Sequence, residues 1–134
     1  MTIVKEQALN LSSSGDIVVV RREARQVAIE LGFSLVDQTK IVTAASELAR
    51  NTIIYGGGGT ARIESVSDGG RRGIRITFED HGPGIPDIGQ AMKDGFTTAG
   101  GLGLGLGGAK RLSNDFEIQS HPGEGTLVRY TRWR

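Results

Sequence analysis

Two polar side chains, Glu47 and Asn51, stand four residues apart in the stretch ELARN. Residues with this spacing lie on the same side of an α-helix, so a carboxylate and a carboxamide would point together into a site. Lys40 falls on the same stripe, beside the apolar face of the expected helix. The alternative for this pattern is a solvent-exposed Glu47 that pairs with Arg50 on the helix surface.

A second group of residues that could take part in binding or catalysis is DHGPGI, which covers residues 80–85 at the end of an expected strand. A carboxylate there can accept a hydrogen bond from an exocyclic amine such as that of adenine. Gly82 and Gly84 would let the backbone approach a planar ligand closely. The alternative is a β-turn in which the Asp80 carboxylate bonds to its own backbone.

The third feature is the run TTAGGLGLGLGG at residues 97–108. Gly103, Gly105 and Gly108 fit G-x-G-x-x-G, but the preceding FTTAGG is no strand, which argues against a dinucleotide-binding βαβ unit. Lys110 lacks the flanking residues of a Walker motif. The remaining interpretations are a flexible hinge, or a mobile loop whose amides bind phosphate oxygens together with the next helix N-terminus.

The elements that position these residues begin with a strand over 2–11, at the edge of a sheet. A helix follows from Asp16, an expected N-cap, and ends at Gly32. A second helix begins with the capping box Ser34–Asp37 and ends at the glycines 56–59. Its apolar stripe consists of Ile41, Ala45, Leu48 and Thr52.

The remaining elements are two hairpins and two helices. Strands over 61–67 and 73–80 flank a turn at 68–70, and strands over 116–120 and 126–133 flank the turn HPGEG. Helices are expected over 86–94, starting at a proline, and over 108–115. The hairpins require antiparallel pairs, so we expect one α/β domain over 1–134. It would be a two-layer sandwich of one mixed, mostly antiparallel sheet with helices on one face.

Composition excludes several functions. The formal net charge of +1 over 134 residues argues against nucleic-acid or anionic-membrane binding. The absence of cysteine excludes a disulfide scaffold and fits a reducing cytoplasm. The chain has no stretch long and apolar enough to span a membrane. His81 and His121 are far apart in the sequence, so no His-rich metal site is expected.

The order of the motifs is more specific than any one of them. E-x-x-x-N, D-x-G-x-G-I, F-T-T with G-L-G-L-G, and finally G-E-G-T together resemble the N, G1, F and G2 elements of the GHKL ATPase superfamily. The resemblance spans residues 34–131 and implies the Bergerat fold with ATP and Mg²⁺ as cofactors. It implies Glu47 as the catalytic carboxylate and Asn51 as the Mg²⁺ ligand. The implied nucleotide-binding residues are Asn51, Asp80, Gly82, Gly84, Ile85, Thr98, Gly103, Leu104, Gly105, Gly107, Lys110 and Thr126.

Within the superfamily, the short connection between F-T-T and the glycines resembles the RsbT-type switch-protein serine kinases of bacterial stress signalling. This resemblance implies phosphorylation of a STAS-domain antagonist and then activation of a PPM-class serine phosphatase, and it is compatible with a homodimer. No arginine lies between Thr98 and Gly108, so Lys110 and Arg111 are the candidate cations for the terminal phosphate. Three alternatives stay open: an anti-sigma factor with kinase activity, a histidine-kinase fragment, and a non-enzymatic switch that binds ATP.

Overall fold

The computed structural model describes residues 1–85, 88–92 and 105–134. The elements follow one another in the order β-α-α-β-β-α-α-β-β, as the sequence predicts. They are β1 (Thr2–Leu11), α1 (Ser14–Glu30), α2 (Leu35–Ile54), β2 (Gly59–Asp68), β3 (Arg71–Asp80), α3 (Ile88–Ala91), α4 (Gly105–Arg111), β4 (Asp115–His121) and β5 (Gly125–Trp133).

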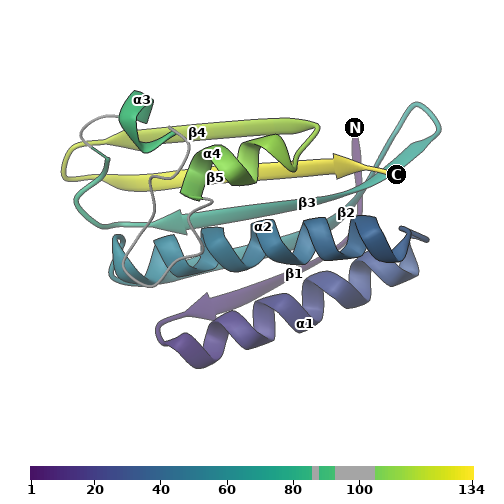
Figure 1. Ribbon diagram of the computed structural model, residues 1–134, viewed down its shortest axis with the longest axis horizontal. Coiled ribbons are helices and arrows are strands. Elements are labelled where there is room, and N and C mark those ends of the chain that lie inside the picture. Colours follow the sequence, from purple (N-terminus) through teal and green to yellow (C-terminus); the bar gives the residue numbers. More distant parts are fainter. Residues whose placement is uncertain (86–87, 93–104) are drawn as a thin grey trace.

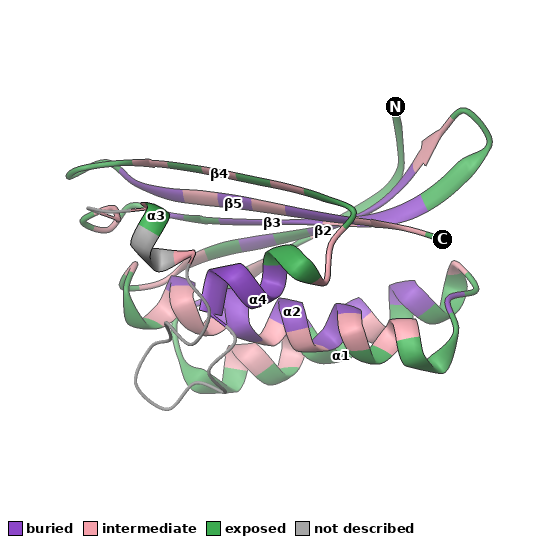
Figure 2. Cartoon of the chain, turned by 45° about the horizontal axis from the view of Figure 1, so that its top comes forward, coloured by how far each residue is buried: buried purple, intermediate pink, exposed green. Residues whose placement is uncertain are grey.

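The fold is the predicted two-layer α/β sandwich (Figure 1). The strands lie in the order β1-β2-β3-β5-β4, which puts β1 at an edge as predicted. All four strand pairs are antiparallel, so the described sheet lacks the parallel pair that a mixed sheet would contain. Figure 2 shows α1, α2 and α4 together on one side of this sheet, and no helix that the structure describes covers the other face. None of the described helices is long and apolar enough to cross a membrane.

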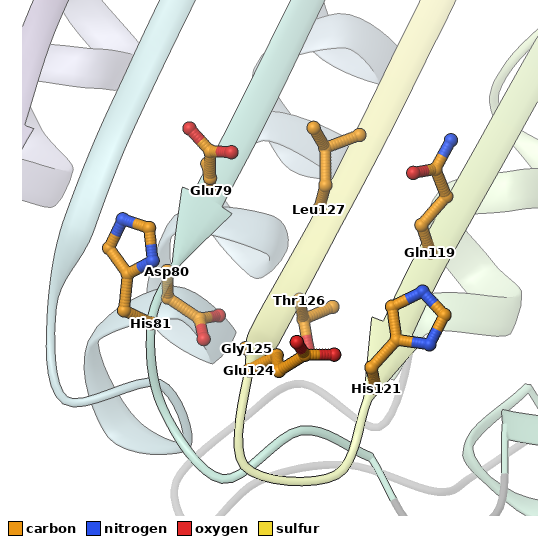
Figure 3. A pocket seen from close by; sticks show the side chains of 9 residues that line it. All are labelled: Glu79, Asp80, His81, Gln119, His121, Glu124, Gly125, Thr126 and Leu127. Atoms are coloured by element: carbon orange, nitrogen blue, oxygen red, sulfur yellow. The ribbon is translucent and has the colours of Figure 1, made fainter.

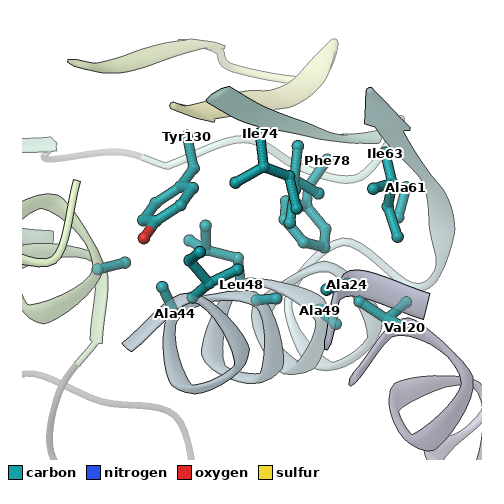
Figure 4. Packing of buried hydrophobic residues seen from close by; sticks show 14 of the residues in the cluster. Val20, Ala24, Ala44, Leu48, Ala49, Ala61, Ile63, Ile74, Phe78 and Tyr130 are labelled. Atoms are coloured by element: carbon teal, nitrogen blue, oxygen red, sulfur yellow. The ribbon is translucent and has the colours of Figure 1, made fainter. Parts of the chain in front are cut away.

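The core lies between the sheet and α2 (Figure 4). Alternate residues of β3, namely Ile74, Ile76 and Phe78, are almost completely buried. They face the predicted apolar stripe of α2, in which Ile41 and Leu48 are buried to the same extent. Buried apolar residues therefore recur every two positions in the strand and every three to four positions in the helix, and the two sets pack against each other in one interface. This packing fixes which side of α2 faces the sheet.

The ends of α1 and α2 are set by local hydrogen bonds. The N-cap of α1 is Ser13, so the prediction of Asp16 as the N-cap is wrong. Asp16 occupies the third helical position, from which its Oδ2 accepts the amide hydrogens of Ser12 and Ser13 at 2.8 and 3.1 Å. An acidic residue in the first turn satisfies amides that have no partner within the helix. In α2 the predicted N-cap Ser34 is confirmed, because Ser34 Oγ accepts the Asp37 amide hydrogen at 3.2 Å. The Asp37 carboxylate, predicted to complete a capping box, accepts a hydrogen bond from Arg132.

The helix α4 differs from the prediction in both of its boundaries. It covers Gly105–Arg111, whereas the sequence predicts 108–115. Leu106 and Ala109, three residues apart, are both buried in the core. Burial of this apolar pair stabilises helical backbone through glycines that would disfavour it in isolation. The predicted helix over 86–94 is described only as α3, Ile88–Ala91.

Candidate functional site

The helix α2 carries the predicted pair at its C-terminal end. Glu47 is buried, with 3% of its surface exposed, and Asn51 follows one turn later. The alternative of a solvent-exposed Glu47 is therefore wrong. A carboxylate is rarely buried to this extent in a protein unless it is paired or has a function. The structure thus places an acid and an amide together at the margin of the core.

The amide oxygen of Asn51 is unusual. Asn51 Oδ1 is buried, and it has no hydrogen-bond partner among the described residues. A buried acceptor without a partner costs about 1–3 kcal/mol. An oxygen of this kind suits a hard cation such as Mg²⁺, which takes few protein ligands and keeps several waters. The residue type and its surroundings therefore fit the ligand role that the sequence implies.

The carboxylate of Asp80 lies at the same end of the sandwich. Asp80 ends β3 and is buried, with 8% of its surface exposed, and its backbone pairs with Thr126 of β5. The Gly82 amide donates to Asp80 Oδ1 at 2.9 Å, which is the local bond that the β-turn interpretation predicts. The turn and a ligand site are thus compatible, because a carboxylate has a second oxygen.

A contact that the sequence did not indicate joins α2 to Asp80. The chain after α2 packs so closely that a Cβ atom at Gly56 would overlap the Asp80 carboxylate. A Cβ at Gly82 would lie 2.8 Å from the Gly56 Cα, closer than real Cβ atoms approach. From the sequence, the glycines at 56–59 indicate only the end of a helix. The structure gives Gly56 a second task, since it lets the end of α2 touch the Asp80 turn.

Ser120 of β4 is a further residue that the sequence did not reveal. Its Oγ accepts the Ile85 amide hydrogen at 2.7 Å and shares a hydrogen bond of 2.8 Å with Thr126 Oγ1. Gly84, with φ of +82°, lies against the backbone of His121, next in sequence to Ser120. Three of the predicted residues therefore meet around one hydroxyl. A serine within a strand carries no motif that would have identified this role.

The predicted phosphate-binding segment is described only in its C-terminal part. Thr98, Gly103 and Leu104 lie outside the described residues. Gly105 and Gly107 are buried within α4, so the expectation that they belong to a loop is wrong. The exposed Lys110 lies in the last turn of α4, away from the N-terminal end of that helix.

The described residues form a pocket at the ends of β3, β4 and β5 (Figure 3). Besides Asp80 and Thr126 it is lined by Glu79, His81, Gln119, His121, Glu124, Gly125 and Leu127. Glu79 is exposed and adjoins the buried Asp80, so the two side chains point to opposite faces of the sheet. The two histidines, distant in sequence, line opposite sides of this pocket, with Gly125 and Thr126 between them (Figure 3). The described residues nevertheless contain no group of three or more His, Cys, Asp or Glu side chains that could hold a metal ion.

Residues 36–133 match the family described as "Histidine kinase-, DNA gyrase B-, and HSP90-like ATPase". The chain belongs to this family. The match covers the described site residues, from Glu47 to Thr126, and confirms the GHKL resemblance. ATP is accordingly the nucleotide of this chain.

Curated relatives narrow the kind of ATPase. The chain is 50% identical over 128 residues to the "Serine/threonine-protein kinase RsbT" of Bacillus subtilis, covering 96% of both chains. It is 33% identical to the "Anti-sigma F factor" of Thermoanaerobacter sp., covering 92% of this chain and 89% of that protein. The chain is an enzyme of this family, an ATP-dependent kinase.

Solved structures agree on the fold. The crystal structure of the RsbU and RsbW domains of a Mycobacterium tuberculosis protein aligns with a TM-score of 0.64 at 21% identity, covering 98% of this chain and 33% of that one. The mycobacterial sensor histidine kinase MprB aligns with a TM-score of 0.55 at 14% identity, covering 96% of this chain and 97% of that one. At these identities the likeness concerns architecture alone.

Proposed function

We propose that the chain is a single-domain serine/threonine-protein kinase that phosphorylates a STAS-domain antagonist in a bacterial partner switch. The observation that carries this proposal is that the buried Glu47 and the unpartnered Asn51 oxygen lie one turn apart on α2, at the end of the sandwich where Asp80 lies. The 50% identity to a named serine/threonine-protein kinase over almost the whole chain supports it.

The proposed division of labour begins with α2. Glu47 accepts the proton of the attacking hydroxyl, or orients that hydroxyl toward the γ-phosphorus, while the bond to ADP breaks. Asn51 Oδ1 holds Mg²⁺, which neutralises phosphate charge when bound. Phosphoryl transfer depends mainly on positioning and electrostatics, so one carboxylate and one amide on a rigid helix are sufficient protein groups.

The base of the nucleotide is assigned to the ends of β3 and β5. Asp80 accepts from the adenine amine, directly or through water, with Thr126 beside it. Gly82, Gly84 and Ile85 form the turn against which the base lies, held to β4 by Ser120. The segment with Thr98, Gly103, Leu104, Gly105 and Gly107, followed by Lys110, is assigned to the phosphates.

The proposed cycle has two partners in the cytoplasm. Phosphorylation of the STAS protein ends its complex with the kinase, because a phosphate adds charge to an interface that was formed without it. The released kinase then binds a PPM-class serine phosphatase and activates it. Free kinase holds ATP weakly in this scheme, and the docked STAS partner completes the enclosure of the nucleotide.

The test is a transfer assay with purified chain, Mg·ATP labelled at the γ-phosphate, and candidate STAS proteins. We expect label on one serine or threonine of one candidate, and none after that residue is changed to alanine. Glu47→Gln should lower the transfer rate by roughly 10²–10⁴-fold with ATP binding retained. Binding of Mg·ATP without transfer to any STAS protein would contradict the proposal.

A second candidate follows from the relatives named anti-sigma F factors, to which the chain is 33% identical over most of its length. In that case the chain would bind a sigma factor as well as a STAS protein. Co-purification of a sigma factor with the tagged chain, in a form competed by the STAS protein, would favour it.

A further inference from the structure

Two side chains of β5 meet at one carbonyl, that of Leu112, which directly follows α4. The Tyr130 hydroxyl donates to Leu112 O at 2.7 Å, and Arg132 Nη1 donates to the same oxygen at 2.9 Å. Figure 4 shows the Tyr130 side chain pointing from the sheet toward the helix layer. Burial raises the pKa of this hydroxyl, so it remains a donor. Two side chains of β5 therefore hold the end of α4.

Arg132 also contacts α2, the helix that carries Glu47 and Asn51. Its Nη2 lies 2.9 Å from Oδ1 of Asp37, in the first turn of α2, and the two side chains are 17% and 35% exposed. The guanidinium thus joins the end of α4 to the start of α2, and we call this arrangement the Arg132 anchor. Arg132 Nε is buried with no hydrogen-bond partner among the described residues.

The Arg132 anchor is not expected to contribute much to the stability of the fold. A partly buried ion pair with an unsatisfied donor is often no more stable than apolar side chains of similar volume. A planar guanidinium with two directed bonds does, however, fix the relative position of the groups it joins. The geometry therefore favours a role in positioning.

The helix that the anchor holds needs such support. The seven residues of α4, GLGGAKR, include three glycines. A glycine inside a helix costs about 0.5–1 kcal/mol relative to alanine. Gly105 and Gly107, at the start of α4, are also assigned to the phosphates of ATP. Their position relative to Glu47 and Asn51 depends on how firmly α4 is held against α2.

We propose that Arg132 is a positioning residue for the triphosphate: by joining Leu112 O to Asp37 it keeps α4 in register with α2 and so fixes the position of Gly105 and Gly107 relative to Glu47 and Asn51. This inference rests on the proposed function, because the assignment of those glycines to the phosphates is part of it.

The test compares Arg132→Met and Asp37→Asn with Arg129→Met as the matched control. Arg129 lies on the same strand but on the opposite face, where it bonds to Thr77 Oγ1 at 3.2 Å and pairs with Glu117 at 3.7 Å. Arg132→Met should raise the KM for ATP roughly tenfold with kcat changed less than about threefold. Arg129→Met should leave both constants unchanged.

A second measurement separates positioning from a loss of stability. AMP lacks the β- and γ-phosphates, so its affinity should be the same in Arg132→Met as in the unmodified chain, while the affinity for ATP falls. Arg132→Lys, which restores a cation without the two directed bonds, should recover only part of the ATP affinity. Asp37→Asn removes the charge with little change of shape and serves if Arg132→Met does not fold.

The outcomes are distinct. An unchanged KM for ATP in folded Arg132→Met or Asp37→Asn, or equal losses of AMP and ATP affinity, would overturn the inference and leave the proposed function standing. Failure of the unmodified chain to bind ATP, both alone and with its STAS partner, would overturn both.

Discussion

At the scale of single residues, the site contains polar groups whose burial lowers the stability of the fold unless they are paired or bind a ligand. Glu47 is a buried carboxylate, and Asn51 Oδ1 is a buried acceptor without a partner in the described structure. The sequence predicts both residues, because their spacing and the motif order identify them. It does not predict Ser120, because its contacts with Ile85 and Thr126 join strands that only the folded sheet brings together.

The orphaned oxygen of Asn51 leads to a prediction with opposite signs for stability and function. Asn51→Leu removes a buried acceptor, so the free energy of unfolding should stay constant or rise by about 1 kcal/mol. Mg²⁺-dependent ATP binding should be lost. Thermal melts and calorimetric titration with Mg·ATP measure the two effects, and Asn10→Leu on the exposed β1 is the control for ATP binding. Retained Mg²⁺-dependent binding would contradict the ligand role of Asn51.

The hydroxyl of Ser120 provides a second prediction at this scale. Ser120→Ala leaves the Ile85 amide and the Thr126 hydroxyl without their shared partner. We expect a loss of about 1–2 kcal/mol in the free energy of unfolding, together with weaker ATP binding. Ser12→Ala is the control, since that serine is exposed and far from the site in sequence. Urea unfolding and ATP titration measure both effects; identical behaviour of the two variants would argue against the role of Ser120.

At the scale of elements, the sequence predicts what local chemistry determines. The turn at Gly69–Gly70, with φ of +57° and +91°, and the Ser34 cap of α2 are encoded in neighbouring residues and are confirmed. The start of α4 is not encoded in neighbouring residues, because it depends on burial of Leu106 and Ala109 against distant elements. In α1 the sequence predicts Asp16 as the N-cap, whereas the structure has Ser13 in that position.

The start of α1 makes the stability of the chain depend on pH. The backbone amides of Ser12 and then Ser13 hold the pKa of Asp16 below its usual value of 3.8. A lowered folded-state pKa adds stability that is present above the unfolded pKa and is lost as the pH falls through the folded one. Between about pH 6 and pH 3 the unmodified chain should therefore lose more stability than Asp16→Asn. Urea unfolding at both pH values tests this; a constant difference between the two proteins would contradict it.

At the scale of the whole molecule, the layer arrangement follows from the two hairpins, which the sequence predicts from the turns between its strands and which require antiparallel pairs. The convergence of α2 with β3 is different. It requires the chain at Gly56 to pass directly against Asp80 and Gly82, and this contact joins residues of separate motifs. The motif order predicts that the two residue groups serve one ligand, but only the fold shows how they are brought together.

The close passage at Gly56 yields a prediction about that convergence. In Gly56→Ala the new Cβ would overlap the Asp80 carboxylate, so the α2–β2 connection or the Asp80 turn must move. We expect a loss of about 1–3 kcal/mol of stability and at least tenfold weaker ATP binding. Gly15→Ala is the control, because its Cβ would lie 3.9 Å from Ser13 Oγ, which is an ordinary van der Waals contact. Melting curves measure the stability of both variants, and titration measures their ATP affinity. Equal ATP affinities would contradict the role of the close contact between Gly56 and Asp80.

The helix-free face of the sheet has a practical consequence. The chain contains no cysteine, and Arg62 is an exposed residue of β2 between the buried, helix-facing Ala61 and Ile63. A single thiol introduced there would carry a fluorophore or a tether to a sensor chip on the side of the sheet opposite α2. The label would leave the helix layer clear, so a protein that binds there could be followed in real time.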